Sequence, residues 1–465
     1  MGIQTAEDAA RPGELRTGAI VASIWLSGAS LIGAAALTSS RPASALPAFA
    51  QQTGQACKSC HVGGFGPELT PFGREFKLGG YTMRTSPSVP VAAMAIASLT
   101  HTRTDQSPPP DHLHANNNLV IDQASLFLAG GVGKHFGGFS QLTYDGVGRT
   151  WSWDNVDLRA VTTGRIFGED AVFGLSLNNN PTVEDSWNTL PAWSFPYTDT
   201  AVSPTPAAAP LIDGALAQNV VGLSAYSWVG HKAYVELGGY TSPGRATISW
   251  LGADPLSPGS LHGLAPYARI AWQTNLAGGI AEVGASALKA AIYPGRDRSS
   301  GLADRYADFG LDASWQKLLG ENSVSAHIRY VHERGNLRAS CALALLGDGT
   351  DPTCARYSLN ETRATVRYTW RDRVGLTLSG FSVSGSRNGS LYSGNGRPDS
   401  NGLTGQIDYT LWPSGNSPLG RRFNVRTGVQ FTAYGKFDGA RRNFDGRGAN
   451  AADNNALRLF TWVAF

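Results

Sequence analysis

The sequence lacks several features that would place it in a common class of protein. Charged residues make up only 16% of its 465 residues, and it contains no block of basic residues that could neutralise phosphates, so nucleic-acid binding is not expected. After residue 46, no run is apolar enough to form a membrane-spanning helix. Methionine occurs only three times, which leaves few thioether side chains as candidate metal ligands.

Glycine and aromatic residues are abundant instead. The chain contains 56 Gly, 12 Trp and 15 Tyr, a composition that favours many short strands over helices. The chain is longer than one ordinary soluble domain, but its length is usual for a large β-barrel. Composition and length together favour an all-β protein.

The first 45 residues have the order of a secretory signal peptide. An apolar run over residues 17–37 follows Arg11 and Arg16, and a small-x-small cleavage sequence follows at residues 43–45. A transmembrane helix is the alternative, because the run approaches spanning length. Ser, Gly and Ala dilute the run, which favours the signal peptide. We therefore interpret residues 1–45 as a signal peptide and expect the chain to be exported.

A haem-attachment motif follows this leader. Cys57, Lys58, Ser59, Cys60 and His61 form a C-x-x-C-H sequence, the signature of c-type haem. The two thiols would add to the vinyl groups of the porphyrin, and His61 would bind the iron as proximal ligand. A chance match, a thioredoxin-like pair and half a zinc site are the alternatives, but no second C-x-x-C and no βαβ pattern is present. We predict one covalently attached haem c.

The predicted cytochrome c segment spans residues 46–88, and its central part, residues 51–84, is very short. A unit of under about 40 residues rarely buries enough surface to fold alone, so a second wall for the haem must come from the rest of the chain. The sequence does not decide which group is the second iron ligand. Met83 and Met94 are candidates, beside a His from the rest of the chain or an open position.

From residue 89 onward, apolar and polar residues alternate in many short segments. In residues 362–371, for example, Val366 and Trp370 lie on one face and Arg367 on the other. A period of two indicates a strand with two different environments. Aromatic residues near the ends of the apolar face are typical of lipid-facing strands. We predict a transmembrane β-barrel of about 16 antiparallel strands over residues 89–465, surrounded by outer-membrane lipid.

Loop lengths support this barrel. The candidate strands are centred near residues 95, 125, 140, 158, 174, 224, 237, 269, 284, 310, 328, 365, 379, 408, 428 and 460. Short links alternate with long ones, which lie at about 103–117, 180–217, 242–262, 292–304, 333–356, 386–401 and 437–454. Bacterial outer-membrane barrels have short periplasmic turns and long external loops, so we expect the long loops to face outside. A barrel of this size has a lumen that the haem segment could plug or cap.

Two further groups of residues have more than one interpretation. Five arginines are predicted to point into the lumen, either to offset haem propionates or as a porin-like polar lining: Arg329, Arg363, Arg367, Arg371 and Arg426. Cys341 and Cys354 lie in one predicted external loop, where a disulfide would stabilise the loop by about 3 kcal/mol. A metal or redox role is the alternative for this pair.

The residues around the haem motif resemble a known family. Residues 46–54, 57–61, 67–77 and 81–82 are similar to the outer-membrane monohaem cytochrome–porin fusion family. Its best-known members are the iron-oxidising outer-membrane cytochromes of Fe(II)-oxidising bacteria. The resemblance covers about 40 residues in detail, whereas the barrel matches only in architecture and length.

This resemblance implies a haem segment in the lumen, or on the periplasmic side, of a barrel in the outer membrane of a Gram-negative bacterium. Electrons would pass from an extracellular donor, with Fe(II) as the first candidate, to a periplasmic soluble cytochrome or copper protein, as in an Fe(II) oxidase. By position it assigns Cys57 and Cys60 as thioether anchors and His61 as proximal ligand. The alternative function is a solute porin whose haem segment gates the channel or senses redox state, and pore conductance separates the two.

Overall fold

The computed structural model describes residues 48–85, 91–347, 354–389, 391–392, 394–415, 417–419 and 423–465. The predicted signal peptide, residues 1–45, lies outside the described residues. The described N-terminal segment and the barrel belong to one compact unit. No helix within the described ranges has the length and apolar character needed to cross a membrane.

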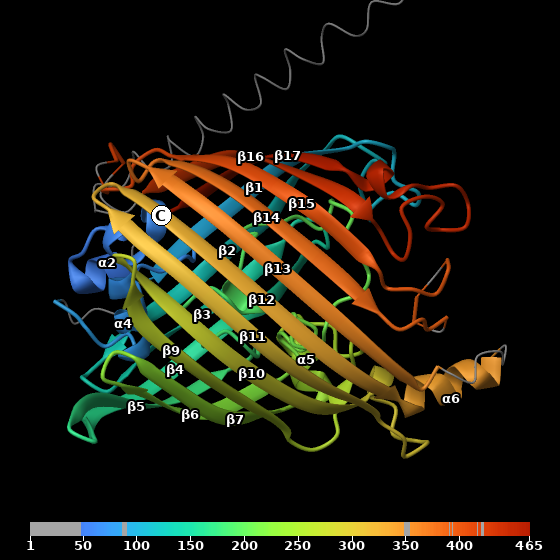
Figure 1. Cartoon of the computed structure of the whole chain (residues 1–465), viewed down its shortest axis with the longest axis horizontal. Coiled ribbons are helices and arrows are strands. Elements are labelled where there is room, and N and C mark those ends of the chain that lie inside the picture. Colours follow the sequence, from blue (N-terminus) through green and yellow to red (C-terminus); the bar gives the residue numbers. More distant parts are fainter. Residues whose placement is uncertain are drawn as a thin grey trace, which may run out of the picture. The chain divides into compact units, whose positions relative to one another are not determined.

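Sixteen long strands form one closed antiparallel sheet (Figure 1). They are β1 (Val91–Thr102), β2 (Asn118–Val132), β3 (Phe136–Asp145), β4 (Thr150–Ile166), β5 (Glu169–Asn178), β6 (Val221–Val229), β7 (Ala233–Thr241), β9 (Ala265–Leu276), β10 (Gly279–Tyr293), β11 (Asp304–Leu319), β12 (Asn322–Leu337), β13 (Arg356–Trp370), β14 (Val374–Gly385), β15 (Ser400–Thr410), β16 (Asn424–Lys436) and β17 (Ala456–Ala464). A two-residue strand, β8 (Ser260–Leu261), pairs with β10. Each long strand pairs with the next, and β17 pairs with β1, which closes the barrel. The predicted fold is confirmed, because every predicted centre falls within a long strand.

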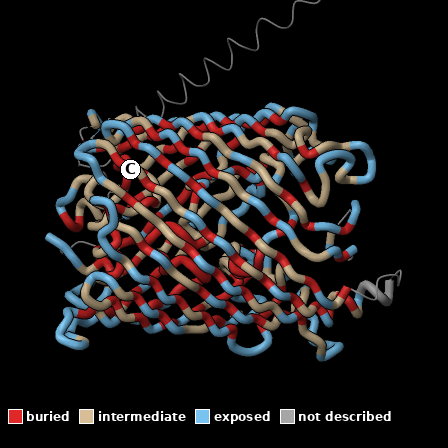
Figure 2. Tube along the Cα trace, viewed as in Figure 1, coloured by how far each residue is buried: buried red, intermediate tan, exposed pale blue. Residues whose placement is uncertain are grey.

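Buried and exposed residues alternate along the strands (Figure 2), as predicted for a wall with one face toward the lumen and one toward the outside. On β13, Val366 is 55% exposed and Trp370 46% exposed, whereas Arg367 is only 2% exposed. The exposed face is apolar and the buried face polar, the reverse of a water-soluble barrel. The polar core therefore lies inside the lumen.

Short helices accompany the barrel. They are α2 (Ala48–Thr53), α3 (Cys57–Cys60), α4 (Pro71–Leu78), α5 (Arg245–Trp250) and α6 (Arg338–Gly347), with 3₁₀ turns η1 (Val62–Gly64), η2 (Pro191–Trp193), η3 (Pro294–Arg296) and η4 (Ala451–Asn454). Helices α2 and α4 lie at one end of the barrel and α6 at the other (Figure 1). A disulfide joins Cys341 to Cys354, with a Cα–Cα distance of 5.4 Å, as one of the two interpretations of this pair anticipated.

The N-terminal segment, residues 48–85, plugs the barrel. Lys58 pairs with Asp372 in the turn between β13 and β14 at 3.4 Å, and Glu75 pairs with His231 in the turn between β6 and β7 at 3.1 Å. These two short turns lie on different sides of the same mouth. The segment therefore occupies the end of the barrel where the short turns are, as the predicted plug requires.

One predicted external loop turns inward instead. Residues 179–220, here called the inward loop, connect β5 to β6 and include the predicted external loop at about 180–217. Their polar groups contact three strands spread around the barrel, at Arg269 of β9, Arg329 of β12 and Arg458 of β17. A loop that reaches strands so far apart must cross the lumen. The physical reason is charge, because carboxylates of the loop pair with arginines that line the wall.

One predicted lumen residue also lies elsewhere. Arg371 is exposed, in the turn after β13, with a left-handed φ of 51°. Its guanidinium lies 4.8 Å from the ring centre of Trp370. The strand ends one residue earlier than the alternation suggests, so the inward and outward pattern no longer applies at Arg371. The other four predicted arginines have their polar contacts inside the lumen.

Candidate cofactor site in the barrel lumen

The C-x-x-C-H motif forms a single helical turn. Cys57 and Cys60 are the first and last residues of α3, and both thiols are free. Residues three apart on a helix are neighbours on one face. The two thiols could therefore both bond to one planar group, such as a porphyrin. The backbone N–H of His61 donates to the carbonyl of Cys57 at 2.9 Å, which ends the turn.

Helix α4 supports this turn from the next stretch of sequence. Thr70 caps α4 by accepting a hydrogen bond from the N–H of Gly73 at 3.2 Å, and Pro71 occupies the first turn, where its missing N–H costs nothing. The N–H of Thr70 also donates to the carbonyl of Cys60 at 2.9 Å. A Cβ atom on Gly73 would overlap that carbonyl, so only glycine lets α4 approach the motif this closely.

A cavity of about 120 Å³ lies beside the motif. Cys60 and His61 border it from the motif itself. Further lining residues come from the N-terminal segment, from strand β3 and from the inward loop: Phe49, Lys77, Tyr81, Phe139, Asp185, Asn188 and Trp193. The second wall that the sequence requires is therefore supplied by the barrel and the inward loop together.

Protonation in this region suits metal binding by an imidazole. Burial, and secondly the charge of Arg426, lowers the pKa of His61 to about 4, so the ring is neutral at pH 7. Its Nδ1 atom is buried without a hydrogen-bond partner. Burial raises the pKa of Cys60 to about 11, and burial also raises that of Cys57. Both groups are thiols at neutral pH, not thiolates.

This donor set fits a c-type haem, which needs two thiols and a neutral imidazole in the C-x-x-C-H order. The aromatic rings around the cavity, from Phe49, Phe139 and Trp193, fit the same group. The volume of this cavity is smaller than the volume of a porphyrin, because about 120 Å³ corresponds to only roughly four water molecules of 30 Å³ each. Side chains that line the cavity would therefore have to move apart to admit the macrocycle.

The inward loop and the N-terminal segment are joined directly at the cavity. The Nζ of Lys77 donates to the carbonyls of Val183 at 2.7 Å and Asp185 at 2.6 Å. The N–H of Leu69 donates to the side-chain oxygen of Asn188 at 2.9 Å. These contacts fix one wall of the cavity against the other.

The two methionines proposed as iron ligands lie outside the cavity lining. Met83 is 49% exposed, and the carbonyl of Met83 accepts a hydrogen bond from Gln52 at 2.8 Å. Met94 packs against Phe65 and Ile96 between the plug and the wall. The structure brings Cys57, Cys60 and His61 together, and neither methionine is among the described residues that line the cavity.

Sequence reasoning missed the contribution of the inward loop. Asp185, Asn188 and Trp193 border the cavity, although all three were assigned to an external loop. Two tryptophans, Trp187 and Trp193, occur in this loop, and bulky aromatic rings are unusual in a solvated segment. These two tryptophans are the sequence signal that could have indicated a loop folded into the lumen.

Four of the five predicted arginines are already paired with carboxylates of the wall and the loop. Arg367 makes a 2.9 Å contact with Asp408, and Arg426 pairs with the same carboxylate at 3.3 Å. Arg329 pairs with Glu361 at 2.8 Å. None of the five predicted arginines lines the cavity, and the cation that does is Lys77. Their pairing is that of a polar lining.

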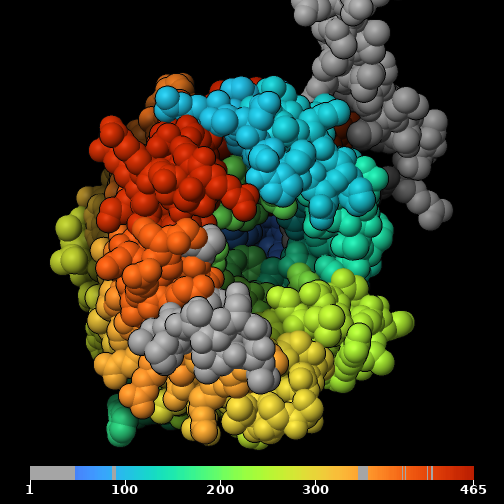
Figure 3. All heavy atoms as spheres, turned by 90° about the vertical axis from the view of Figure 1, so that its right-hand side faces the viewer, coloured from blue at the N-terminus to red at the C-terminus, as the bar shows by residue number. Residues whose placement is uncertain are grey.

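At the other end, the barrel is hollow. Figure 3 looks onto the mouth that carries α6, and atoms of the N-terminal segment, in blue, are visible at the bottom of the hollow. The lumen is therefore a vestibule that opens at the long-loop end and is closed by the plug.

The sequence matches no model of a known protein family and no curated protein. The structure is similar to several solved barrels at low identity. OmpF of Salmonella typhi has 12% identity and a TM-score of 0.47, with 81% of this chain and 97% of that chain covered. An anion-selective porin from Comamonas acidovorans has 12% identity and a TM-score of 0.45, with 81% and 99% covered. OmpT of Vibrio cholerae has 9% identity and a TM-score of 0.41, with 81% and 97% covered.

Proposed function

We propose that this protein is an outer-membrane electron conduit that carries one covalent haem c inside a porin-like barrel. The outer wall supports the location. Leu378 is 60% exposed and Ile407 59% exposed, and similar apolar side chains cover many strands. An apolar wall of this extent is stable against lipid, and a closed barrel leaves no unpaired backbone edge in the membrane.

The observation that carries the proposal is the position of the C-x-x-C-H motif. Cys60 and His61 border a cavity in the lumen that is enclosed by the N-terminal segment, the barrel wall and the inward loop. A free segment of this length could not enclose a haem. Docked in the lumen, it could hold the cofactor at a depth that lipid would not permit.

Different residues at the cavity would hold different parts of the haem. Cys57 and Cys60 would form the thioether links, and the neutral imidazole of His61 would bind the iron. Lys77 supplies a positive charge at the cavity that would offset a propionate. The bound haem would supply reversible one-electron chemistry, which is what a conduit requires.

The geometry supports a direction of entry. A soluble donor can reach the plug through the vestibule at the long-loop end, and a carrier protein can dock at the short-turn mouth. We propose extracellular Fe(II) as the donor and a periplasmic soluble cytochrome or copper protein as the acceptor. Fe(III) formed by the reaction is poorly soluble, so oxidation outside the cell keeps the product out of it.

The contents of the lumen favour a conduit over a solute porin gated by its haem. Two parts of the chain, the N-terminal segment and the inward loop, occupy the lumen, and the inward loop contacts strands around the barrel. A planar bilayer containing the wild-type protein should therefore pass little ion current. A current comparable to that of open porins would favour the solute porin.

The decisive experiment uses the oxidised protein in liposomes, mixed without oxygen with external Fe(II). Prompt reduction of the haem absorption band is the expected result. The Cys57→Ala, Cys60→Ala double variant should show no such band. If the wild-type haem stays oxidised with Fe(II) but is reduced by dithionite, the cofactor is functional and Fe(II) is not the donor.

A further inference from the structure

Four cationic side chains lie close together on the outer wall near the long-loop mouth. They are Lys289 on β10, Arg305 on β11, Arg334 on β12 and Arg356 on β13, four consecutive strands. All four are exposed on the outward face. Because neighbouring strands are about 4.8 Å apart, the cluster spans roughly 14 Å along the wall.

The strand register explains why these four form one site. Lys289 is opposite Ala307, and Ala307 is opposite Arg334, so both cations share one outward row. The next row contains Arg305 and Arg356, which are both opposite Asn336. Small or polar residues separate the cations in each row. The wall is therefore recessed between the charges.

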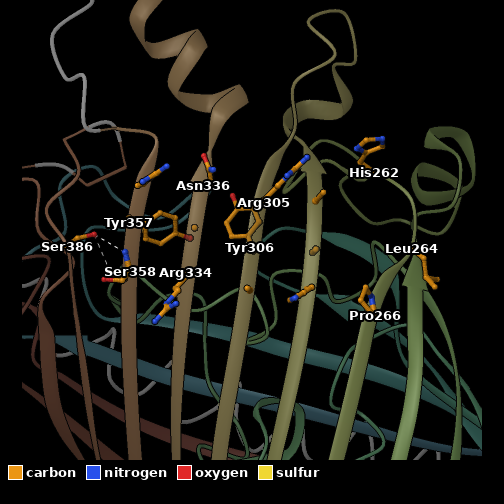
Figure 4. A pocket seen from close by; sticks show the side chains of 16 residues that line it. His262, Leu264, Pro266, Arg305, Tyr306, Arg334, Asn336, Tyr357, Ser358 and Ser386 are labelled. Atoms are coloured by element: carbon orange, nitrogen blue, oxygen red, sulfur yellow. Dashed lines mark hydrogen bonds between the residues drawn. The ribbon is translucent and has the colours of Figure 1, made fainter.

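This recess is a shallow cavity of about 940 Å³ (Figure 4). His262, Asn336 and Ser358 add polar groups to its lining. No Asp or Glu is among the described residues that line it. Within the described parts of the chain, none of the four cations makes a salt bridge, and Arg334 donates only to the ring of His332. As far as the described residues show, the site has positive charge and no anion of its own.

The surroundings place the cluster at the border of the apolar band. Moving along the strands away from the loops, the next outward row contains Phe309, 48% exposed, opposite His332. The row after it contains Leu311, 48% exposed, and Tyr330, 37% exposed. Tyr330 and Leu311 are opposite each other. Aromatic and apolar residues below a row of cations are what the boundary between acyl chains and headgroups would contact.

We propose that this cluster, Lys289, Arg305, Arg334 and Arg356, binds the phosphate groups of an anionic glycolipid in the outer leaflet. Arginine presents paired N–H donors that match phosphate oxygens, and such charge-assisted hydrogen bonds are strong. The acyl chains would cover Phe309, Leu311 and Tyr330. A free phosphate ion would use the cations but not the apolar rows, which is why we assign a lipid. The inference rests on the proposed membrane location, but it uses neither the haem motif nor the cavity beside it.

The test is lipid binding by the full-length protein in detergent, measured by native mass spectrometry. The probes are diphosphoryl lipid A, phosphatidylcholine and inorganic phosphate. Wild-type protein should retain lipid A in preference to phosphatidylcholine. The Lys289→Gln, Arg334→Gln variant should bind lipid A at least about tenfold more weakly, the effect of losing one charge-assisted hydrogen bond. The matched control, Lys134→Gln with Lys232→Gln, removes two charges from exposed turns at the other end and should bind as the wild type does.

Several results would overturn the assignment. If the wild type and the Lys289→Gln, Arg334→Gln variant bind lipid A equally well, the cluster is not the lipid-binding site. Equal affinity for lipid A and phosphatidylcholine would exclude phosphate recognition, and inorganic phosphate binding as tightly as lipid A would exclude a lipid. Flotation with liposomes checks that each variant is folded and inserted. A wild type that does not insert contradicts the membrane location itself, and a protein that inserts but does not react with Fe(II) contradicts only the electron-transfer proposal.

Discussion

The ammonium group of Lys77 lies 5.1 Å from the ring centre of Trp193. These residues are 116 positions apart, one on helix α4 and one on the inward loop, and both border the cavity beside the C-x-x-C-H motif. The contact joins the two parts of the chain that fill the lumen. Changes at either residue are therefore expected to affect both the plug and the loop.

Haem attachment is the first prediction. Purified mature protein should retain one haem after acid–acetone extraction, because thioether links survive the treatment that removes haem held only by coordination. The Cys57→Ala, Cys60→Ala variant should lose the haem stain. The Cys341→Ala, Cys354→Ala variant removes the disulfide pair instead and should keep it. Loss of the haem in the second variant alone would contradict the assignment.

The second prediction concerns the other iron ligand. Met83 and Met94 are the candidates from the sequence, and loss of a thioether ligand lowers the reduction potential. Redox titration and the reduced spectrum of Met83→Ala and Met94→Ala should therefore identify the ligating residue by a large downward shift in one variant only. If neither variant differs from the wild type, the second ligand is another group or the position is open.

Lys77 provides the third prediction. Replacing it with Met removes the donor from the carbonyls of Val183 and Asp185, and each buried acceptor left unsatisfied costs roughly 1–3 kcal/mol. The inward loop should then exchange its amide hydrogens faster. Lys58→Met is the control, because its partly exposed pair with Asp372 is worth about 0–1 kcal/mol. Equal exchange in the two variants would show that Lys77 does not hold the loop.

The fourth prediction concerns pore conductance. Deleting residues 51–85 removes the plug and should raise the single-channel current above that of the wild type. The current should stay below that of an open porin of the same strand number, because the inward loop still crosses the lumen through Asp185 and Arg269. Adding Asp185→Ala to the deletion should raise it again. A plug deletion that already conducts like an open porin would contradict the position of the loop.

Acidity should loosen the plug. Burial alone would raise the pKa of Glu68, but hydrogen bonding and charge from His327, with Arg367 nearby, lower it to about 2. A carboxylate whose pKa is lowered by folding stabilises the folded form fully above its usual pKa of 4.5 and loses that contribution as the pH falls toward 2. Protease cleavage of the segment should therefore increase over this range. Glu68→Gln should be cleaved more readily at neutral pH and show less dependence on acid.

The barrel could be predicted from the sequence because each strand carries its own signal. Alternation around Val366 and Arg367 needs no knowledge of the rest of the fold, since one residue must face lipid and the other the lumen. The same rule is wrong at Arg371, where a turn begins, although residues 371–373 also fit a short link between two strands. Alternation therefore locates strands well and their ends poorly.

The cavity could be predicted only in part. Cys57, Cys60 and His61 are adjacent in sequence, so a spacing motif is enough to find them. The opposite wall comes from Asn188 and Trp193, whose position depends on how a long loop pairs with distant strands. Loop length is the same whether a loop extends outward or folds inward. Long-range charge pairing decides between the two, and it cannot be seen in a single sequence.

Closure of the barrel sets an order for its biogenesis. The first strand pairs with the last, and the plug contacts residues as far along the chain as Trp462. Cys57 and Cys60, which remain partly exposed in the folded barrel, thus take their place beside the cavity only when the whole chain has been synthesised and the ring of strands has formed. Under the proposed function, an enzyme that attaches haem would have to act on the chain before the motif docks in the barrel. We therefore expect that barrels assembled without haem cannot be loaded afterwards, and that haem added late should stain only the unfolded fraction.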